Sequence, residues 1–335
     1  MIDLHLHLDG SLNPNNISVM AQMSGIELGY SEEELKKMLM VEPNCTNLGE
    51  YLEKFELPLK VLQTKECIEY AVYELMRDLD LQGLRYVEIR FAPQLHKQRN
   101  LSQEEVVQAA IRGLNKGNSD FSVSANLILC CMRGDKNNHE NMETINVAEK
   151  YLGKGICAVD LAGNEAAYPT KQFEEVFTAA IRKNIPIIIH AGEAAGAESI
   201  RQALKFGAVR IGHGIHAIDD EDLMCILRDK NIYLEMCYSS NLQTKTVNVV
   251  EDYPIVEFLK NDLGVTLNTD NITVSNTTLR NEYLLVQKQF SLDENTLLNI
   301  VLNSVKATFL SEDRKEQLKE QIIREFSEWL NKIDK

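Results

Sequence analysis

The chain has 335 residues, of which 44% are hydrophobic and 25% are charged, and its formal net charge is −15. This balance is typical of a globular protein with a sizeable core, and no apolar run approaches the roughly 18 residues that a membrane span needs. Such an acidic chain is a poor partner for nucleic acid, because phosphate binding requires a basic surface.

Seven cysteines occur; Cys130 and Cys131 are adjacent and the others stand alone, so the sequence contains no C-x-x-C pair. Disulfide frameworks and thiolate zinc sites are therefore poor interpretations, and small apolar core residues in a reducing cytoplasm are the better one. The first residues also lack the basic and then apolar pattern of a signal peptide. We expect a cytoplasmic protein with no membrane segment and no obligate protein partner.

The first predicted element is the strand IDLHLHL (2–8), which contains two of the seven histidines. Residues i and i+2 of a strand point to the same face, so His5 and His7 are presented together. Two neighbouring imidazoles are either packed and hydrogen-bonded or hold a metal ion. The strand alone leaves both interpretations open.

Residues 13–82 are rich in Glu, Lys, Leu and Met, which predicts a helical insertion after the first strand. Within it, one helix face with the spacing i, i+3, i+4, i+7 is formed by Leu48, Tyr51, Leu52 and Phe55. That face either packs into the core or covers a binding site as part of a lid.

From residue 83 onward, short β-branched runs alternate with amphipathic segments of helical period. Strands are predicted at 84–92, 121–131, 155–163, 185–192, 208–214, 231–239 and 264–270, with helices between them at 172–183, 197–206, 219–230 and 250–261. Together with the first strand, this alternation predicts an α/β fold, a (β/α)8 TIM barrel with parallel strands. A doubly wound open sheet is the alternative, but no G-x-G-x-x-G follows the first strand. Residues 292–335 predict C-terminal helices, and the lack of a linker predicts one domain, 1–335.

Side chains that can bind a metal ion or transfer a proton lie at the ends of these predicted strands. Barrel enzymes carry function at the C-terminal ends of their strands, whereas the other ends serve stability. The residues at such ends are His5, His7, His190, His213 and Asp270. One histidine there is most often structural, but this many groups together favour a metal site. Other titratable residues along the strands are expected to point outward.

A single Zn²⁺ with a water at its open position suits the three imidazole nitrogens and one carboxylate oxygen of His5, His7, His190 and Asp270. Divalent iron or manganese accepts the same ligand types, so the donor set leaves the metal open. A second metal is not expected, because the fourth strand ends VDLAGNE, without the lysine that bridges two metals in binuclear barrel hydrolases.

Glu193 follows a predicted ligand in HAGEAAG (190–196), at the start of a helix. A carboxylate there is either a helix cap or, beside an activated water, a general acid or base. In IGHGIHA (211–217), His213 ends the strand between two glycines and is the inward candidate, whereas His216 lies in the following loop.

Seven motifs occur in order along nearly the whole chain: HLHLDGS (5–11), YVEIRFAP (86–93), DLAGNE (160–165), HAGE (190–193), GHG (212–214), SSN (239–241) and NTD (268–270). Together they resemble the adenosine deaminase branch of the metal-dependent amidohydrolases, whose fold is also a (β/α)8 barrel. The resemblance implies hydrolytic deamination of adenosine and 2′-deoxyadenosine to inosine and 2′-deoxyinosine, with release of ammonia.

The resemblance also implies a role for each residue. It assigns zinc to His5, His7, His190 and Asp270. It assigns contacts with the purine nucleoside to His7, Asp9, Gly163 and Asn271, and a hydrophobic gate to Tyr51, Leu52 and Phe55. In catalysis, Glu193 would protonate the purine N1, while His213 and Asp270 would orient and deprotonate the water that attacks C6.

One position departs from the family pattern, which often has two aspartates after the threonine of Thr269-Asp270-Asn271. The resemblance implies that the second of these residues faces purine N7, which is a hydrogen-bond acceptor. An amide donates at any pH, whereas a carboxyl group donates only when protonated, so Asn271 is expected to preserve the contact.

Two other functions stay open. One is a sister deaminase acting on adenine or a modified adenosine; the other is a non-catalytic metal- or purine-binding barrel. Asp9 favours a nucleoside, because adenine-specific relatives tend to carry Glu there, and the lack of a Lys/Arg cluster at the strand ends disfavours AMP. A decayed enzyme would be expected to lose Glu193 or His213 before its metal ligands, and both are present.

Overall fold

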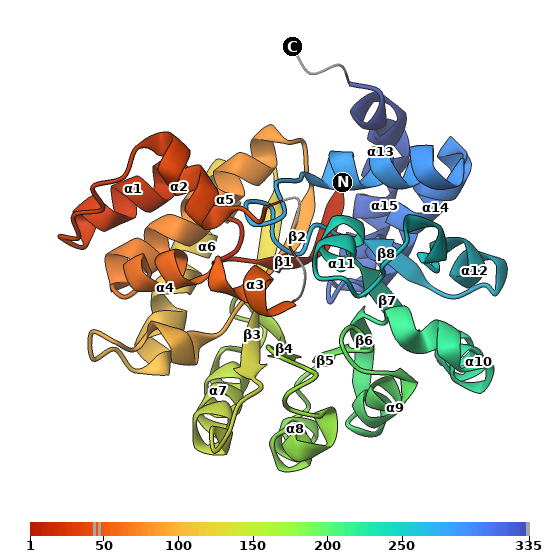
Figure 1. Cartoon of the computed structure of the whole chain (residues 1–335), viewed down its shortest axis with the longest axis horizontal. Coiled ribbons are helices and arrows are strands. Elements are labelled where there is room, and N and C mark those ends of the chain that lie inside the picture. Colours follow the sequence, from red (N-terminus) through yellow and green to blue (C-terminus); the bar gives the residue numbers. More distant parts are fainter. Residues whose placement is uncertain (43–44, 46–47, 333–335) are drawn as a thin grey trace.

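The computed structural model describes residues 1–42, 45 and 48–332, and eight parallel strands form its centre. The strands are β1 (Ile2–His7), β2 (Tyr86–Phe91), β3 (Ser124–Met132), β4 (Ile156–Ala162), β5 (Ile187–Ala191), β6 (Ala208–His213), β7 (Tyr233–Met236) and β8 (Val265–Leu267). Each strand lies beside its predecessor in the chain, and helices surround the strands (Figure 1). The predicted (β/α)8 TIM barrel is confirmed.

The helices fall into three groups along the chain. The insertion after β1 contains α1 (Pro14–Met23), α2 (Glu32–Leu39), α3 (Leu48–Glu53), α4 (Glu56–Val61) and α5 (Lys65–Leu81). Between later strands lie α6 (Gln103–Asp120), α7 (Asn138–Tyr151), α8 (Glu174–Arg182), α9 (Ala197–Lys205), α10 (Glu221–Asp229), α11 (Tyr238–Gln243) and α12 (Ile255–Lys260), with the 3₁₀ turns η1 (Pro93–His96), η2 (Thr170–Phe173), η3 (Ile215–Asp219) and η4 (Val250–Asp252). After β8 come α13 (Leu279–Phe290), α14 (Glu294–Ala307) and α15 (Glu312–Leu330).

The predicted helical insertion and C-terminal helices are therefore present, although 43–44 and 46–47 of the former and 333–335 of the latter lie outside the described residues. Among the described helices, none combines the length and the apolar character that crossing a bilayer requires.

The helix predicted through Leu48 and Phe55 is interrupted. The helix α3 ends at Glu53 and α4 begins at Glu56, with a turn between them. Pro58 explains the break, because a proline ring clashes with the carbonyl four residues earlier in a continuous helix, here that of Lys54. Similarly, Pro254 separates η4 from α12 where one helix was predicted at 250–261.

The apolar core lies between the strands and the surrounding helices. Outward-facing strand residues such as Val87 and Ile89 are fully buried there. The close approach of α6 to α5 is made possible by Gly113 of α6, because a Cβ at this position would lie 2.3 Å from the carbonyl oxygen of Glu69 in α5. A larger residue would push these two helices apart and away from the strands they cover.

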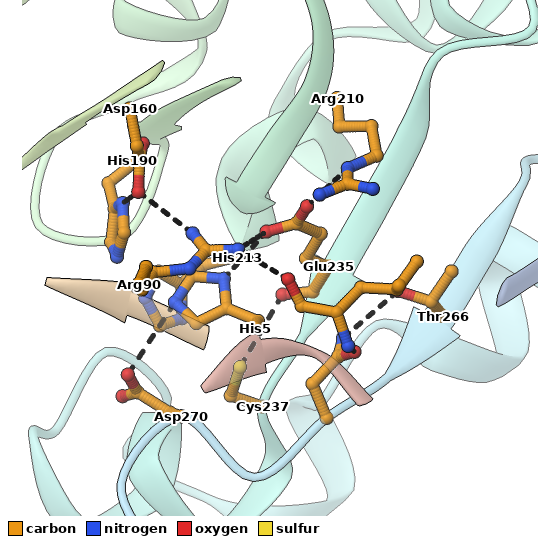
Figure 2. A network of polar contacts seen from close by, with 12 residues as sticks. His5, Arg90, Asp160, His190, Arg210, His213, Glu235, Cys237, Thr266 and Asp270 are labelled. Carbon is orange, nitrogen blue, oxygen red and sulfur yellow. Dashed lines mark hydrogen bonds and ion pairs between the residues drawn. The ribbon is translucent and has the colours of Figure 1, made fainter. Parts of the chain in front are cut away.

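The barrel interior contains a group of buried charged residues, so the prediction that titratable strand residues point outward is wrong. These residues, each at most 1% exposed, are Glu88, Arg90, Asp160, Arg210 and Glu235. They come from β2, β4, β6 and β7 and neutralise one another across the barrel. Figure 2 shows Arg90, Asp160, Arg210 and Glu235 of this group. Burial of charge is tolerated here because each ion has an opposite partner at hydrogen-bond distance.

Candidate active site

The groups predicted at the strand ends meet at the C-terminal end of the barrel. His5 and His7 lie on β1, His190 on β5, and Asp270 three residues after β8. The Nε2 atoms of His7 and His190 are 3.2 Å apart, and Asp270 Oδ1 lies 3.5 Å from Nε2 of both His5 and His7. The His213 ring, at the end of β6, lies 4.8 Å from that of His5 between centroids.

The backbone at these positions is irregular. The pairing of β1 with β2 shifts register between Asp3 and Leu6, as a β-bulge around His5. His213 and Asp270 adopt left-handed conformations, with φ of 60° and 61°. Bulges and left-handed non-glycine residues cost free energy and concentrate at functional sites, where they aim a side chain.

Buried carboxylates orient two of the imidazoles. Glu235 Oε2 lies 2.8 Å from His5 Nδ1, and Asp160 Oδ2 lies 2.9 Å from His190 Nδ1. Arg90 joins these carboxylates, because its Nη1 is 2.8 Å from Asp160 Oδ2 and its Nη2 is 2.8 Å from Glu235 Oε2 (Figure 2). A carboxylate on Nδ1 turns the ring so that its Nε2 faces the centre of the site, as metal-binding histidines require.

Two residues of the SSN motif hold the remaining groups. Ser240 donates to Asp270 Oδ2 at 2.6 Å, which leaves Oδ1 facing the histidines. The side-chain amide of Asn241 lies 3.1 Å from His213 Nδ1 and fixes that ring with its Nε2 toward the cavity.

The donor set fits a divalent metal. His5 Nε2 is buried without a hydrogen-bond partner among the described residues. Burial holds the pKa of His7 and His190 below the usual value, so their nitrogens are neutral and available. The separations of 3.2–3.5 Å are short enough for these atoms to share one ion at about 2.0–2.2 Å from each of them.

The carboxyl group of Glu193 lies beside this cluster, in the loop between β5 and α9. Its Oε2 is 3.6 Å from His213 Nε2, and the side chain is buried. Burial, together with the negative charges of Asp270 and Glu165, raises the pKa of Glu193 to about 8. A protonated carboxyl group at neutral pH is suited to donate a proton.

A cavity of about 320 Å³ opens above the cluster. All predicted site residues except His5 line it, namely His7, Asp9, Tyr51, Leu52, Phe55, Gly163, His190, Glu193, His213, Asp270 and Asn271. His5 lies beneath, fully buried. The size of this cavity and its largely apolar wall with a few polar groups are typical of a small-molecule site.

The polar wall of the cavity includes Asp9 and Asn271. Asp9 Oδ1 is buried without a hydrogen-bond partner among the described residues, and burial raises the pKa of this carboxyl group to about 6. Asn271 packs on Gly10, where a Cβ would lie 1.8 Å from Asn271 Oδ1. Gly10 therefore leaves the space that the Asn271 side chain occupies.

The apolar face predicted at Tyr51, Leu52 and Phe55 contributes to the cavity and to local packing. Tyr51 is buried, and its hydroxyl group lies 2.7 Å from Ser275 Oγ. It packs with Val274, while Leu52 and Phe55 are partly exposed and border the cavity.

Several site residues were missed by the sequence reasoning. Arg90, Asp160 and Glu165 lie within the quoted motifs, which was the available signal for them, whereas Glu235 lies in none. Arg133, which lies outside these motifs, also borders the cavity, but its guanidinium donates to Tyr168 O, Thr170 Oγ1 and His190 O.

The fold and donor set define a metal-dependent hydrolase on a TIM barrel. A family model described as adenosine deaminase matches residues 1–325. The chain is 50% identical to an adenosine deaminase of Haemophilus ducreyi over 323 residues, 95% of this chain and 94% of that one. It is 40% identical to an adenosine deaminase of Clostridium perfringens over 328 residues, 96% and 97% of the two chains. An adenine deaminase structure from Arthrobacter aurescens matches with a TM-score of 0.88 and 27% identity, covering 97% of this chain and 98% of that one. The chain belongs to the adenosine deaminase family and is a hydrolase.

Proposed function

We propose that this protein is a zinc-dependent adenosine deaminase that converts adenosine and 2′-deoxyadenosine to inosine and 2′-deoxyinosine and releases ammonia. The observation that carries this proposal is the position of Glu193 and His213 beside the donor cluster of His5, His7, His190 and Asp270 at the base of one cavity. A water, a proton donor and a proton acceptor are the groups that hydrolysis of an amidine carbon–nitrogen bond requires.

The proposed ligands of the metal are His5, His7, His190 and Asp270. A divalent ion held there supplies Lewis-acid activation of a water at neutral pH. Zinc is proposed because it accepts three imidazole nitrogens and one carboxylate oxygen together with a water as a fifth ligand, and two of these histidines have orienting carboxylates on Nδ1.

Glu193 is proposed as the general acid. Its carboxyl proton would pass to purine N1, which makes C6 electrophilic, and water oxygen would then add to C6. His213 and Asp270 would orient this water and accept its proton, because His213 is aimed by Asn241 and Asp270 by Ser240. The proton accepted from the water would then pass to the amino nitrogen, and the bond between C6 and that nitrogen would break to release ammonia. The proton left on the C6 oxygen would return to Glu193.

The substrate contacts are proposed from the cavity lining. The Asn271 amide would donate to purine N7 and the Gly163 N–H to N3. The unpartnered Asp9 Oδ1 would accept from the ribose 5′-hydroxyl group, which explains a buried carboxylate oxygen without a protein partner. The apolar cover over the nucleoside would be Leu52 and Phe55, with Tyr51 behind them.

The cavity favours a nucleoside over its 5′-phosphate. Arg133 is the only lysine or arginine among the described residues that line it. Both Nη atoms of Arg133 are engaged with main-chain carbonyls and Thr170, so they are not available to a phosphate. Adenine is the second candidate, because the structure named adenine deaminase is similar; the higher identity to adenosine deaminases disfavours it.

We further propose that residues 1–335 act as one catalytic domain in which the insertion 13–82 covers the cavity, as the cavity-lining residues of α3 support. A small purine nucleoside is the proposed partner. The buried thiols of Cys130, Cys131 and Cys157 suit a reducing cytoplasm.

An ultraviolet assay of metal-loaded protein with adenosine, 2′-deoxyadenosine, adenine and AMP tests the proposal. We expect loss of adenine absorbance with the two nucleosides and none with AMP. Turnover of adenine alone would keep the chemistry but contradict the role of Asp9. No turnover of any of the four compounds would contradict the proposed function.

A further inference from the structure

The loop that carries Glu193 is held by one buried carboxylate. Glu165 lies just after β4 and is 1% exposed. Its Oε1 accepts the main-chain N–H of Gly192 at 2.8 Å, and its Oε2 accepts those of Glu193, Ala194 and Ala195 at 3.0, 2.8 and 3.0 Å. Four successive N–H groups therefore converge on a single side chain.

A chain of hydrogen bonds links the Glu165 carboxylate to β5, the strand that carries the proposed metal ligand His190. Ser199, in the first turn of α9, donates to Glu165 Oε1 and lies 2.7 Å from Thr170 Oγ1. Thr170 accepts from Arg133 Nη2 at 2.9 Å, and the same Nη2 donates to the carbonyl of His190 at 2.6 Å. The end of β5 and the loop after it are thus held from the two sides by Arg133 and Glu165.

The loop has little freedom to take another shape with these contacts in place. Gly192 has a φ of +68°, and a Cβ there would lie 2.5 Å from Ile200 Cδ1, so the turn requires glycine. With Gly192 turning the chain and Glu165 holding the next three N–H groups, the Glu193 side chain is directed into the cavity, 3.6 Å from His213.

We infer that Glu165 is a positioning residue for Glu193, acting through the main chain of 192–195 and independently of the metal. This inference rests on the proposed function, because it takes Glu193 as the proton donor. Glu165 itself is not among the residues that line the cavity, so it is not placed to contact the substrate. A general acid displaced by about 1 Å can lose about 10²-fold in rate.

The test is a double-mutant cycle of Glu165→Gln and Glu193→Gln, with kcat, KM and bound zinc measured for each variant. Glutamine keeps the size of Glu165 but replaces one acceptor oxygen with an NH₂ group that faces main-chain donors. We expect Glu165→Gln to lower kcat about 10²-fold with KM and zinc content little changed. In the Glu193→Gln protein, measured by long single-turnover incubations, the same change should add little.

A matched control is Glu198→Gln, which alters an exposed carboxylate of α9 whose polar contacts are with Gln202 and Lys205 of the same helix. It should keep the kcat of the wild type. If Glu165→Gln fails to fold, Ser199→Ala removes one donor to Glu165 and should lower kcat by a smaller factor, again without loss of zinc.

The outcomes separate this inference from the proposed function. Undiminished activity of Glu193→Gln would contradict the proton-donor role itself. If that role is upheld, a wild-type kcat in Glu165→Gln would overturn the inference. If Glu165→Gln does not fold, a wild-type kcat in Ser199→Ala would overturn it. Multiplicative losses in the double variant, or loss of zinc with Glu165→Gln, would also overturn it, because Glu165 would then act on the metal site or the fold.

Discussion

Glu193 and Asp270 share the floor of one cavity, yet their surroundings shift their pKa values in opposite directions. Burial raises the pKa of Glu193 to about 8, and the charges of Asp270 and Glu165 add to this effect. Burial also opposes ionisation of Asp270, but the nearby imidazoles of His5 and His7 hold its pKa well below the ordinary value. Such a separation suits one carboxyl group to donate a proton and the other to bind a cation.

Replacement of Glu193 by Gln tests the proton donor. Glutamine has nearly the same size as glutamate, and residue 193 is not one of the proposed metal ligands, so the variant should keep its zinc. It cannot transfer a carboxyl proton to purine N1, and kcat for adenosine should fall by at least about 10²-fold. The measurement is kcat by ultraviolet absorbance together with zinc content by atomic emission.

The comparison variant for the metal is His190→Ala, which should lose most of its zinc. Near wild-type kcat in Glu193→Gln would mean that another group protonates the substrate, and full zinc content in His190→Ala would contradict the proposed ligand set.

Residues at strand ends could be predicted from the sequence because strand pattern and side-chain chemistry together determine where they lie. His5, His190 and Asp270 were found in this way. Glu235 was not, because its role depends on pairing with His5 across 230 positions of the chain. Nothing in the local pattern of a buried strand shows that a carboxylate will find its partners inside the barrel, rather than face solvent.

At the scale of elements, Arg90 ties together strands that are distant in the sheet. It lies on β2, contacts Asp160 on β4 and Glu235 on β7, and donates to the carbonyl of Leu4 on β1 at 2.5 Å. Both carboxylates in turn orient histidines of the metal cluster, so this one guanidinium supports two proposed ligands. The barrel's stability and the shape of its site depend on the same buried charge.

Replacement of Arg90 by Met should therefore destabilise the protein and weaken zinc binding. Loss of the guanidinium leaves the buried negative charges of Asp160 and Glu235 without one of their positive partners. Breaking a buried ion pair lowers the free energy of unfolding by roughly 3–5 kcal/mol. Urea denaturation of metal-free protein measures this cost without the contribution of zinc.

The control is Arg85→Met, which breaks a partly exposed ion pair with Glu325. That pair should be worth only about 0–1 kcal/mol. Equal effects of the two substitutions would show that the buried network contributes no more than a surface pair does.

The segment that carries Tyr51, Leu52 and Phe55 shows why the boundaries of helices were predicted less well than their presence. The spacing from Leu48 to Phe55 indicated one helix. Pro58 lies beyond these residues in the chain, yet it interrupts the helix because its ring cannot fit against the carbonyl four residues earlier. The side chains still face the cavity, because the residues of the turn remain close to helical; Phe55 has φ −83° and ψ −12°.

At the scale of the whole molecule, the barrel closes at the seam between β8 and β1. The only pairing found there among the described residues is an isolated bridge of Leu6 with Asp270. Asp270 N–H donates to the His5 carbonyl and His7 N–H to the Asp270 carbonyl, each at 2.8 Å. The residues that close the barrel are therefore proposed metal ligands or lie directly beside them.

Removal of the metal should for this reason lower the stability of the entire fold. An ion held by His5, His7, His190 and Asp270 would cross-link β1, β5 and the segment after β8, whereas the unfolded chain offers no such arrangement. Binding to the folded state alone stabilises it by about 2.7 kcal/mol when free metal is about 100 times its Kd. Calorimetry with and without a chelator should therefore show a lower Tm for the metal-free protein.

The control for metal removal is His190→Ala, whose Tm should change little on addition of chelator, because the ligand set is incomplete. An unchanged Tm of the wild type after verified loss of zinc would contradict the cross-link across the seam. A decrease of equal size in His190→Ala would contradict it as well, since the stabilising metal would then be bound elsewhere. A chelator effect confined to the wild type would instead place the stabilising ion at the site that includes His190, whose other proposed ligands lie on both sides of the seam, so that closing the barrel and assembling the site would be coupled.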